Sequence, residues 1–432
     1  MFKKLFLGFS ENIYGKSPVW LQHVFVSLYG YGWKRRRFGG IFQQEYHAAK
    51  ERENYSAAQW QQYTQEHLQK ILLHAFHHVP YYHEVFLKHG IDENKIKQIT
   101  HETIRQVPVL QREALRKYGT TTLLSDAREK QGQFFSSSGS TGSPVEILYS
   151  HAMHQRWFAL FERSVRNWAG VSSNMMRGMI GGRKVVPSAI SKPPYYRYNF
   201  FEKQVYFSAY HINAAHAKNY LDGIKKYGVL YMTGYAMSNF FLAKFFKELQ
   251  LQAPQLKAVL TSSEKLTDEM RAVFKEVYHC KTFDSWGSVE ACGLVTECEH
   301  GSLHINPDAG FIEVLDENMQ PVKTGQRGNV YCTGFLNYDQ PLIRYAIGDS
   351  FIPGENNCKC GRSMPAVKEI TGRTEDVIHG KDGRLMVRFH SVFYGLLSIK
   401  KSQVIQEMPG SILVKVVTDG GLSKTDETTR SH

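Results

Sequence analysis

The side chains best suited to chemistry lie in three segments that are far apart in the sequence. The first is a run of small and polar residues, Ser137-Ser138-Gly139-Ser140-Thr141-Gly142-Ser143-Pro144, between two apolar stretches. Glycines let the backbone approach an anion closely, and backbone N–H groups and hydroxyls donate to phosphate oxygens. A Gly-Lys-Ser/Thr sequence is absent and a strand is predicted next, so the run is not a Walker A loop. It predicts either a phosphate-binding loop or a polar hairpin without a ligand.

The second and third segments carry an acid beside a glycine or an aromatic residue. Trp286-Gly287-Ser288-Val289-Glu290 follows a predicted strand and could supply a stacking plate, close backbone approach and a carboxylate for Mg²⁺. In the third, Asp349 follows Gly348 and could present both oxygens to the two hydroxyls of a ribose. Taken singly, the second segment fits better a strand-to-turn transition with a solvated glutamate, and the alternative for the third is an ordinary Asx turn.

Together and in this order, the three segments resemble those of the adenylate-forming superfamily of acyl-CoA synthetases. The hinge sequence of that family also has a counterpart, Gly372-Arg373-Thr374-Glu375-Asp376. The chain is most similar to the phenylacetate–CoA ligase branch, especially its CapK-like members from capsular polysaccharide gene sets. That similarity covers nearly the whole chain and includes His78-Val79-Pro80-Tyr81-Tyr82, Gly181-Gly182-Arg183, Thr233-Gly234-Tyr235 and Ser262-Ser263-Glu264.

The resemblance implies an AMP-forming ligase that uses ATP and Mg²⁺ to convert a small carboxylic acid into an acyl-adenylate and passes the acyl group to CoA. The resemblance implies that Ser137 to Gly142 bind phosphate, with Ser140 and Thr141 catalytic, and that adenine is bound by Ser263, Glu264, Trp286, Gly287 and Ser288. It implies that Glu290 binds Mg²⁺ and is catalytic, that Asp349 binds the ribose, and that Arg373 is catalytic and binds the nucleotide. It further implies a hinge pivot at Glu375 and a substrate pocket at Arg183, Tyr210 and Tyr235. Positioning and electrostatics would carry such a reaction.

The sequence departs from the family pattern at several positions. Val145 replaces a basic residue and Val289 replaces a threonine. The family's C-terminal lobe carries a Gly-Lys motif whose lysine stabilises charge during adenylation, and the chain stops at Arg430-Ser431-His432 before it. We therefore expect either that the reading frame continues beyond His432 or that the protein is a weakened or non-catalytic member of the family. The alternatives are an amide or ester synthetase that does not use CoA, and a non-catalytic nucleotide-binding homologue.

Four residues predict a structural zinc site. Cys298 and His304 form one pair, and Cys358 and Cys360 the other, with Gly361 beside them to permit a tight turn. Three thiolates and one imidazole make a closed tetrahedral set with no open position for a substrate. His300 competes with His304 as the fourth ligand. The paired arrangement also resembles a zinc site of some members of the branch.

The elements that must position these residues alternate regularly over residues 214–290. Helices are predicted over 214–226, 238–249 and 267–278, the last with Thr267 as an N-cap, and strands over 229–232, 258–260 and 281–283. This rhythm indicates a parallel sheet covered by helices, with ligands at the carboxyl ends of its strands. A further helix is predicted from Met153 to Trp168 and closed by Gly170.

We therefore predict an α/β protein with the adenylate-forming enzyme fold. A large N-terminal lobe of helix-covered mixed and parallel sheets plus a small β unit precedes a small α+β C-terminal lobe. The predicted boundaries are a helical segment over 1–130, an ATP- and substrate-binding core over 131–372 with the β unit from about 305, and a partial lid lobe over 373–432.

Composition limits the partners. The net charge of +13 favours anionic partners such as nucleotides, CoA or an acidic membrane surface. Only Lys34 to Arg37 forms a tight basic run and no stacking motif accompanies it, so nucleic acid is not expected. The chain lacks a secretory signal and an apolar run long enough to span a membrane, so we expect a cytoplasmic protein with reduced cysteines. Peripheral association with a membrane or a polysaccharide-assembly complex, and a homodimer, stay open.

Overall fold

A mixed sheet of 12 strands is the main feature of the computed structural model, which describes residues 14–137, 144–186, 192–373, 377–379, 385–387, 399–408, 411–418 and 421. Its strands are β3 (Arg177–Gly181), β4 (Tyr196–Asn199), β5 (Gln204–Ser208), β6 (Tyr231–Tyr235), β7 (Ala258–Ser262), β8 (Lys281–Gly287), β9 (Leu294–Glu297), β10 (Leu303–Ile305), β11 (Gly310–Leu315), β12 (Gly328–Gly334), β13 (Tyr345–Pro353) and β14 (Ala366–Arg373). They lie in the order β11-β12-β13-β14-β10-β9-β8-β7-β6-β3-β5-β4.

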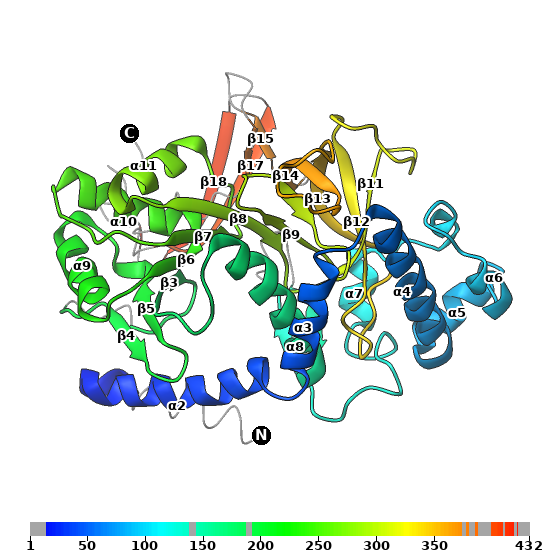
Figure 1. The fold of residues 1–432 in the computed structure, drawn as a ribbon, viewed down its shortest axis with the longest axis horizontal. Coiled ribbons are helices and arrows are strands. Elements are labelled where there is room, and N and C mark those ends of the chain that lie inside the picture. Colours follow the sequence, from blue (N-terminus) through cyan, green and yellow to red (C-terminus); the bar gives the residue numbers. More distant parts are fainter. Residues whose placement is uncertain are drawn as a thin grey trace.

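One half of this sheet is parallel and covered by helices, as the alternating pattern predicts. Strands β5, β3, β6, β7 and β8 pair in parallel. The connecting helices are α9 (Ala217–Lys226), α10 (Ala236–Glu248) and α11 (Asp268–Tyr278), which lie beside these strands in Figure 1. The Thr267 hydroxyl accepts from the Met270 N–H at 3.3 Å, which confirms the predicted N-cap. Helix and strand ends differ from the prediction by a few residues.

The predicted small β unit is the antiparallel half of the same sheet. Strands β9 to β14 pair antiparallel, and β8 joins the two halves through its antiparallel pairing with β9. The sheet is therefore continuous from the covered parallel strands to the strand that ends at Arg373. A residue at the end of β8 and one on β13 can meet because the sheet twists and curves between them.

The N-terminal part is helical, as predicted, over the residues that the structure describes. Its helices are α2 (Val19–Phe38), α3 (Phe42–Arg52), α4 (Ala57–His78), α5 (Pro80–Lys88), α6 (Glu93–Lys97) and α7 (Arg112–Tyr118). α4 begins with a capping box between Ser56 and Gln59 and buries Leu68, Ile71 and Leu72 completely. In Figure 1 α4, α5 and α6 flank the antiparallel half, and α2 lies along the lower edge of the molecule below β4.

The helix predicted from Met153 to Trp168 is present but changes its winding. It is α-helical in α8 (His151–Leu160), π-helical over Phe161–Arg166 and 3₁₀ over Asn167–Ala169, and ends at Gly170 with φ 71°. The wider winding coincides with a buried ion pair, in which the Arg163 guanidinium donates to the Asp308 carboxylate at 2.9 Å. Periodicity predicted the helix, whereas the π segment depends on tertiary contacts that the sequence pattern does not contain.

Three hairpins complete the described structure. β1 (Gln133–Ser136) pairs antiparallel with β2 (Glu146–Tyr149), β15 (Val377–His379) with β16 (Leu385–Val387), and β17 (Ile399–Met408) with β18 (Ser411–Thr418). The last two lie in the part predicted as the C-terminal lobe. Among the described helices, none combines the length and apolarity required to cross a membrane.

Candidate functional site

The base of the predicted phosphate loop is a closed hairpin. The Ser137 N–H donates to the Val145 carbonyl at 2.9 Å, and the Val145 N–H donates to the Ser137 hydroxyl at 3.0 Å. Val145, which stands where the family has a basic residue, is completely buried and anchors the hairpin in the core. The strand–loop–strand prediction is confirmed, while Ser138, Gly139, Ser140, Thr141 and Gly142 lie outside the described residues.

The hairpin is joined to the segment that carries the predicted Mg²⁺ ligand. The Tyr149 hydroxyl, on β2, donates to the Val289 carbonyl at 2.7 Å. The next residue, Glu290, is only 5% exposed and accepts a hydrogen bond from the Tyr345 hydroxyl at 3.3 Å. Burial and the Glu290 charge raise the pKa of Tyr345, so the phenol stays a donor to the carboxylate. The segment that carries Glu290 therefore contacts the loop hairpin through Tyr149. It also contacts Tyr345, four residues before Asp349 in the third segment.

The third segment meets the second through a direct side-chain bond. The Trp286 indole N–H donates to the Asp349 carboxylate at 2.8 Å, and the Phe351 ring packs edge-on against the indole, with the ring centroids 4.9 Å apart. Asp349 is opposite Arg373 in the β13–β14 register. The predicted adenine plate, ribose ligand and hinge arginine are therefore neighbours, although only the backbone of Arg373 is described and Glu375 lies outside the described residues.

Arg112 is a candidate that the sequence analysis missed. It begins α7, and its guanidinium lies near enough to Tyr345 to oppose electrostatically the rise in that residue's pKa. Its Nε and Nη2 are buried without a hydrogen-bond partner in the part of the chain that the structure describes. A buried guanidinium is costly without an anion. Its position beside the Tyr345–Glu290 pair suits a phosphate, and only the fold brings α7 there.

The loops around this region hold non-glycine residues in the left-handed region of backbone space. Ser263 follows β7 with φ 70°, Ala291 follows Glu290 with φ 47°, and Arg344 precedes β13 with φ 46°. Such residues cost about 1–3 kcal/mol each and gather at functional sites. Arg344 itself is structural, because its buried guanidinium bonds both oxygens of Glu313, at 2.8 and 2.9 Å.

Glu264 connects the loop after β7 to the loop after β6. Its carboxylate accepts from the Met237 N–H at 2.8 Å in the first turn of α10. An acid at a helix N-terminus satisfies a free N–H group and is favoured by the helix dipole. In this conformation the carboxylate holds the β7 loop against the β6 loop, beside the predicted substrate residue Tyr235.

The structure brings together two of the three predicted substrate residues. A Cβ on Gly182 would lie 2.7 Å from the Tyr235 hydroxyl, and the Tyr210 hydroxyl donates to the Gly182 carbonyl at 3.0 Å. Gly234 must be glycine, because its φ is 123° and a Cβ there would lie 1.8 Å from the Ile180 carbonyl oxygen. The close packing at Gly182 thus brings both tyrosine hydroxyls to the same backbone segment.

Arg183 lies apart from those tyrosines. Its guanidinium donates to the Tyr206 hydroxyl at 3.2 Å and lies 5.8 Å from the centre of the Trp33 ring. These partners belong to β5 and α2, so the side chain faces the N-terminal helix. Its part in substrate binding stays a prediction.

The four predicted zinc ligands form one cluster. Their ligand atoms all lie within 4.8 Å of one another, with 3.6 Å between the sulfurs of Cys298 and Cys358 and 3.4 Å between Cys360 Sγ and His304 Nε2. These separations are far longer than a disulfide and match the edges of about 3.5–3.8 Å that a zinc tetrahedron requires. His300 is exposed and is not in the cluster.

The surroundings of the cluster suit a closed metal site. His304 Nδ1 lies 3.2 Å from the Met364 carbonyl, which orients Nε2 towards Cys360, as outer-sphere partners of metal-bound histidines do. Gly361 has φ 76° and its N–H donates to the Cys358 carbonyl at 3.3 Å, so the predicted turn is present. Burial raises the pKa of the Cys298 thiol to about 12, so this cysteine would ionise only beside a cation that stabilises the thiolate.

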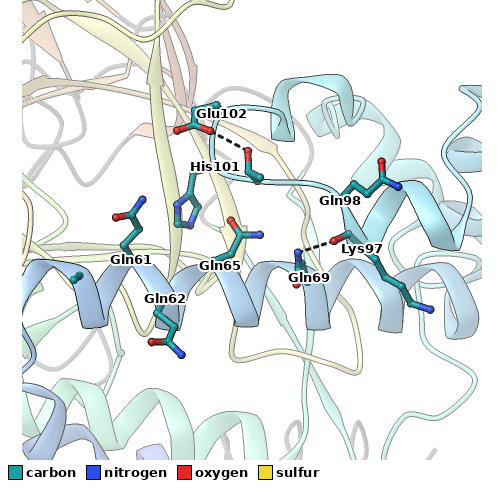
Figure 2. A pocket seen from close by; sticks show the side chains of 10 residues that line it. Gln61, Gln62, Gln65, Gln69, Lys97, Gln98, His101 and Glu102 are labelled. Atoms are coloured by element: carbon teal, nitrogen blue, oxygen red, sulfur yellow. Dashed lines mark hydrogen bonds between the residues drawn. The ribbon is translucent and has the colours of Figure 1, made fainter.

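A polar surface groove lies away from these groups. It runs between α4 and the segment after α6 and is shown in Figure 2. Two of its glutamines tie elements together: the Gln65 amide donates to the Ile99 carbonyl at 2.6 Å and the Gln69 amide to the Lys97 carbonyl at 2.9 Å. It therefore ties a loop to α4 and contains none of the predicted site residues.

The sheet, the phosphate-loop hairpin and the converging segments define the class: the chain has the fold of the adenylate-forming ligases. A solved structure of 2-hydroxyisobutyryl-CoA ligase aligns with a TM-score of 0.62 at 17% identity, over 84% of this chain and 79% of that one. An open conformation of that ligase aligns with a TM-score of 0.58 at 19% identity, over 88% and 85% of the two chains. These likenesses show the fold.

Sequence comparison gives the relatives, although no protein-family profile matches the chain. It is 24% identical to protein CapK of Staphylococcus aureus over 425 residues, which cover 96% of this chain and 90% of CapK. It is 23% identical to phenylacetate-coenzyme A ligase of Thermus thermophilus over 335 residues, or 73% and 70% of the two chains. The chain is thus a homologue of CapK and the phenylacetate-coenzyme A ligases, which confirms the resemblance in its motifs.

Proposed function

We propose that the protein is an AMP-forming acid–CoA ligase, which condenses a carboxylic acid with ATP to an acyl-adenylate and then transfers the acyl group to CoA. One observation carries this proposal: the Trp286–Asp349 and Tyr345–Glu290 hydrogen bonds gather the predicted adenine, ribose and metal ligands beside the phosphate-loop hairpin. The homology to phenylacetate-coenzyme A ligases supports the same reaction. So does a solved structure of 2-hydroxyisobutyryl-CoA ligase, which holds its acyl-AMP and CoA.

The nucleotide residues have separable tasks in this proposal. Ser140 and Thr141 and the backbone of their loop hold the phosphates, Arg112 adds a positive charge beside them, and Asp349 accepts from the ribose hydroxyls. Glu290 has acceptor capacity left after its bond from Tyr345, which suits one carboxylate ligand of Mg²⁺. When bound, Mg²⁺ would neutralise phosphate charge during attack on the α-phosphate.

Adenine lies in this proposal against Trp286, Gly287 and Ser288. The Ser288 hydroxyl is buried and has no hydrogen-bond partner among the described residues, so it can donate to a ligand. Ser263 and Glu264 border the same pocket from β7. Arg373 reaches the nucleotide from the end of β14, and Glu375 is the pivot that follows it.

The carboxylic acid lies in this proposal beside Tyr210 and Tyr235, whose hydroxyls both lie close to Gly182. Direct attack requires its carboxylate to be aligned with the α-phosphate, so positioning supplies much of the rate. The CapK homology extends over 96% of the chain and favours an acid used in a surface polysaccharide. It also favours a second candidate acyl acceptor in place of CoA, namely an amine or hydroxyl group of a polysaccharide precursor.

Cys298, His304, Cys358 and Cys360 hold a structural Zn²⁺ in this proposal. The cluster leaves no open coordination position, so it does not act on the substrate. Its two halves come from the β9–β10 hairpin and the segment before β14: Cys298 and Cys358 are 60 positions apart, and His304 and Cys360 are 56 positions apart. The ion would therefore pin two distant parts of the antiparallel half together.

Exchange of pyrophosphate into ATP tests the adenylation step directly. The purified chain is offered a panel of aromatic, hydroxy and sugar acids with Mg²⁺, and exchange that depends on one acid is the expected result. Glu290→Gln should abolish it while thermal unfolding stays cooperative. Product analysis with and without CoA then separates thioester formation from amide or ester formation. Nucleotide binding without exchange for any acid would contradict the proposal and favour a non-catalytic homologue.

A further inference from the structure

The outer face of α2 is apolar although it faces solvent. Trp20, Val24, Leu28 and Tyr31 are exposed by 66%, 43%, 61% and 52%, and they are spaced three or four residues apart. At that spacing they form one stripe along the helix. A surface helix normally turns charged residues outward. A contiguous exposed apolar face on such a helix marks an interaction surface.

Other sides of α2 contact the body of the protein. Arg197 hydrogen-bonds the buried Gln22 side chain, and the Ser27 hydroxyl contacts β4 through the Tyr198 carbonyl at 3.4 Å. Gly30 lies so close to the end of β4 that a Cβ there would be 2.0 Å from the Asn199 side chain. The outer stripe is therefore a preformed platform.

Neighbouring aromatic residues widen the stripe. Phe25 and Tyr29 of α2 are also exposed. Phe200, in the turn after β4, is 64% exposed, and its N–H donates to the Ser27 hydroxyl at 3.1 Å, which places it at the edge of the helix. Helix α2 lies along the lower edge of the molecule in Figure 1, below β4. Trp and Tyr have amphipathic rings that favour the boundary between lipid and water.

The charges on α2 itself have one sign, and the buried Glu202 beside it pairs with Arg37. α2 contains no acidic residue, and its C-terminal end carries exposed Lys34 and Arg35. Lys16 and Lys203 are exposed near the two ends of the patch. Burial, Arg197 and Lys226 together lower the pKa of His23 to about 4, which places the exposed Lys226 beside the helix as well. An anionic surface complements this arrangement.

We propose that α2 docks the protein on a bilayer containing anionic lipids, with the Trp20–Tyr31 stripe in the interface and Lys34, Arg35 and their neighbours against headgroup phosphates. An in-plane helix with an apolar aromatic face and flanking basic residues binds membranes in this way. A second copy of the chain fits less well, because a two-fold contact through the same face brings two sets of positive charge together.

The test is sedimentation of the full chain with vesicles of phosphatidylcholine alone or with about 30 mol% phosphatidylglycerol. The charge variant Lys34→Gln/Arg35→Gln should bind the anionic vesicles more than tenfold more weakly, since each surface charge contributes about fivefold. The apolar variant Trp20→Ser/Leu28→Ser should lose at least tenfold. The matched control Leu87→Ser/Leu249→Ser removes two exposed leucines elsewhere and should bind like the parent.

A conservative variant keeps the test independent of folding. Brominated lipid should quench tryptophan fluorescence in the parent and much less in Trp20→Phe, which should still sediment. Binding should weaken as salt screens the charges. Vesicle binding that is absent, or unaffected by both α2 variants, overturns the proposal. So does a dimer, measured by light scattering without lipid, that both α2 variants dissociate.

Discussion

The Trp286 indole N–H donates to the Asp349 carboxylate at 2.8 Å, and both side chains are at least nine-tenths buried. The bond joins the end of β8 to the middle of β13, which are 63 residues apart in sequence. It fixes the plane of a carboxylate that the proposed reaction uses to accept two ribose hydroxyls. A hydrogen bond to a charged group in a buried setting is stronger than one between neutral groups.

Trp286→Phe removes this donor and keeps an aromatic ring. We expect AMP and ATP to bind about tenfold more weakly, because a hydrogen bond to a charged group contributes about 1.5–3 kcal/mol. Isothermal titration calorimetry with AMP measures the change. Trp20→Phe is the matched control, since it makes the same change at an exposed site. Unchanged or tighter binding by Trp286→Phe would show that the indole competes with the ribose.

Arg112→Gln tests the buried guanidinium at the start of α7. We expect kcat/KM for ATP to fall by about tenfold to a hundredfold, while the unfolding temperature stays equal or rises, because the change removes a cation with two buried nitrogens that no described residue accepts from. Steady-state adenylation and thermal unfolding are measured on the same sample. Arg112→Lys should recover part of the activity, and Lys117→Gln, on the same helix, should behave like the parent. A loss of stability with intact ATP kinetics would assign Arg112 a structural role.

Cys358→Ser tests the zinc proposal. Bound zinc should fall from about one per chain to a small fraction, and the unfolding temperature should fall with it, because the cluster links two distant segments. Elemental analysis after gel filtration and a thermal scan give the two numbers. Cys280→Ser changes a cysteine outside the cluster and should leave the zinc content unchanged. Full zinc retention in Cys358→Ser is the result that rejects the site.

The buried His154 should make stability depend on pH. Burial, with the charges of Arg36 and Arg37, lowers its pKa from 6.5 to about 3, and the Arg36 Nε–H donates to its Nδ1 at 2.7 Å. Below pH 6.5 the unfolded chain binds a proton at this ring that the folded chain does not bind. The free energy of unfolding should therefore fall as pH drops from 6.5 towards 3, by up to about 1.4 kcal/mol per pH unit from this group.

Unfolding by urea at a series of pH values measures that slope. His154→Asn provides the control, because its amide oxygen can accept from Arg36 and does not ionise. The variant should be less stable near neutral pH and lose less stability on acidification. The half-buried His23, with a folded-state pKa of about 4, adds a slope of the same sign that the variant retains. Parallel curves for the parent and the variant would show that His154 does not titrate as stated.

Local pattern was enough to predict most elements of the fold. The αβαβ rhythm gave the parallel half and the Thr267 cap, because hydrophobic period and capping are local properties. The continuity of the sheet from β8 through β9 and β10 to β14 was not predictable, since strand pairing is long-range. The π segment after α8 was missed for the same reason, because the buried Arg163–Asp308 pair joins residues 145 positions apart.

The residues of the candidate site also differ in whether the sequence pattern points to them. The roles of Glu290 and Asp349 were predicted from motifs that resemble a known family, and the cysteine cluster from residue type and pairing. The structure places the four cluster residues together, while the roles of Glu290 and Asp349 stay predictions. Arg112 was missed, since nothing adjacent to it in sequence distinguishes it from any arginine at a helix start. Arg183 was grouped with the tyrosines on the strength of its segment alone, whereas its side chain contacts Tyr206 and Trp33.

One consequence concerns β14, whose two ends lie in different chemical settings. The strand starts six residues after Cys360 and pairs with β10 beside His304, and it ends at Arg373, opposite Asp349. In the zinc proposal, metal starvation during expression would loosen the same strand that carries the predicted hinge arginine. A preparation short of zinc could then pass for a catalytically dead mutant, and metal content deserves to be recorded beside every rate.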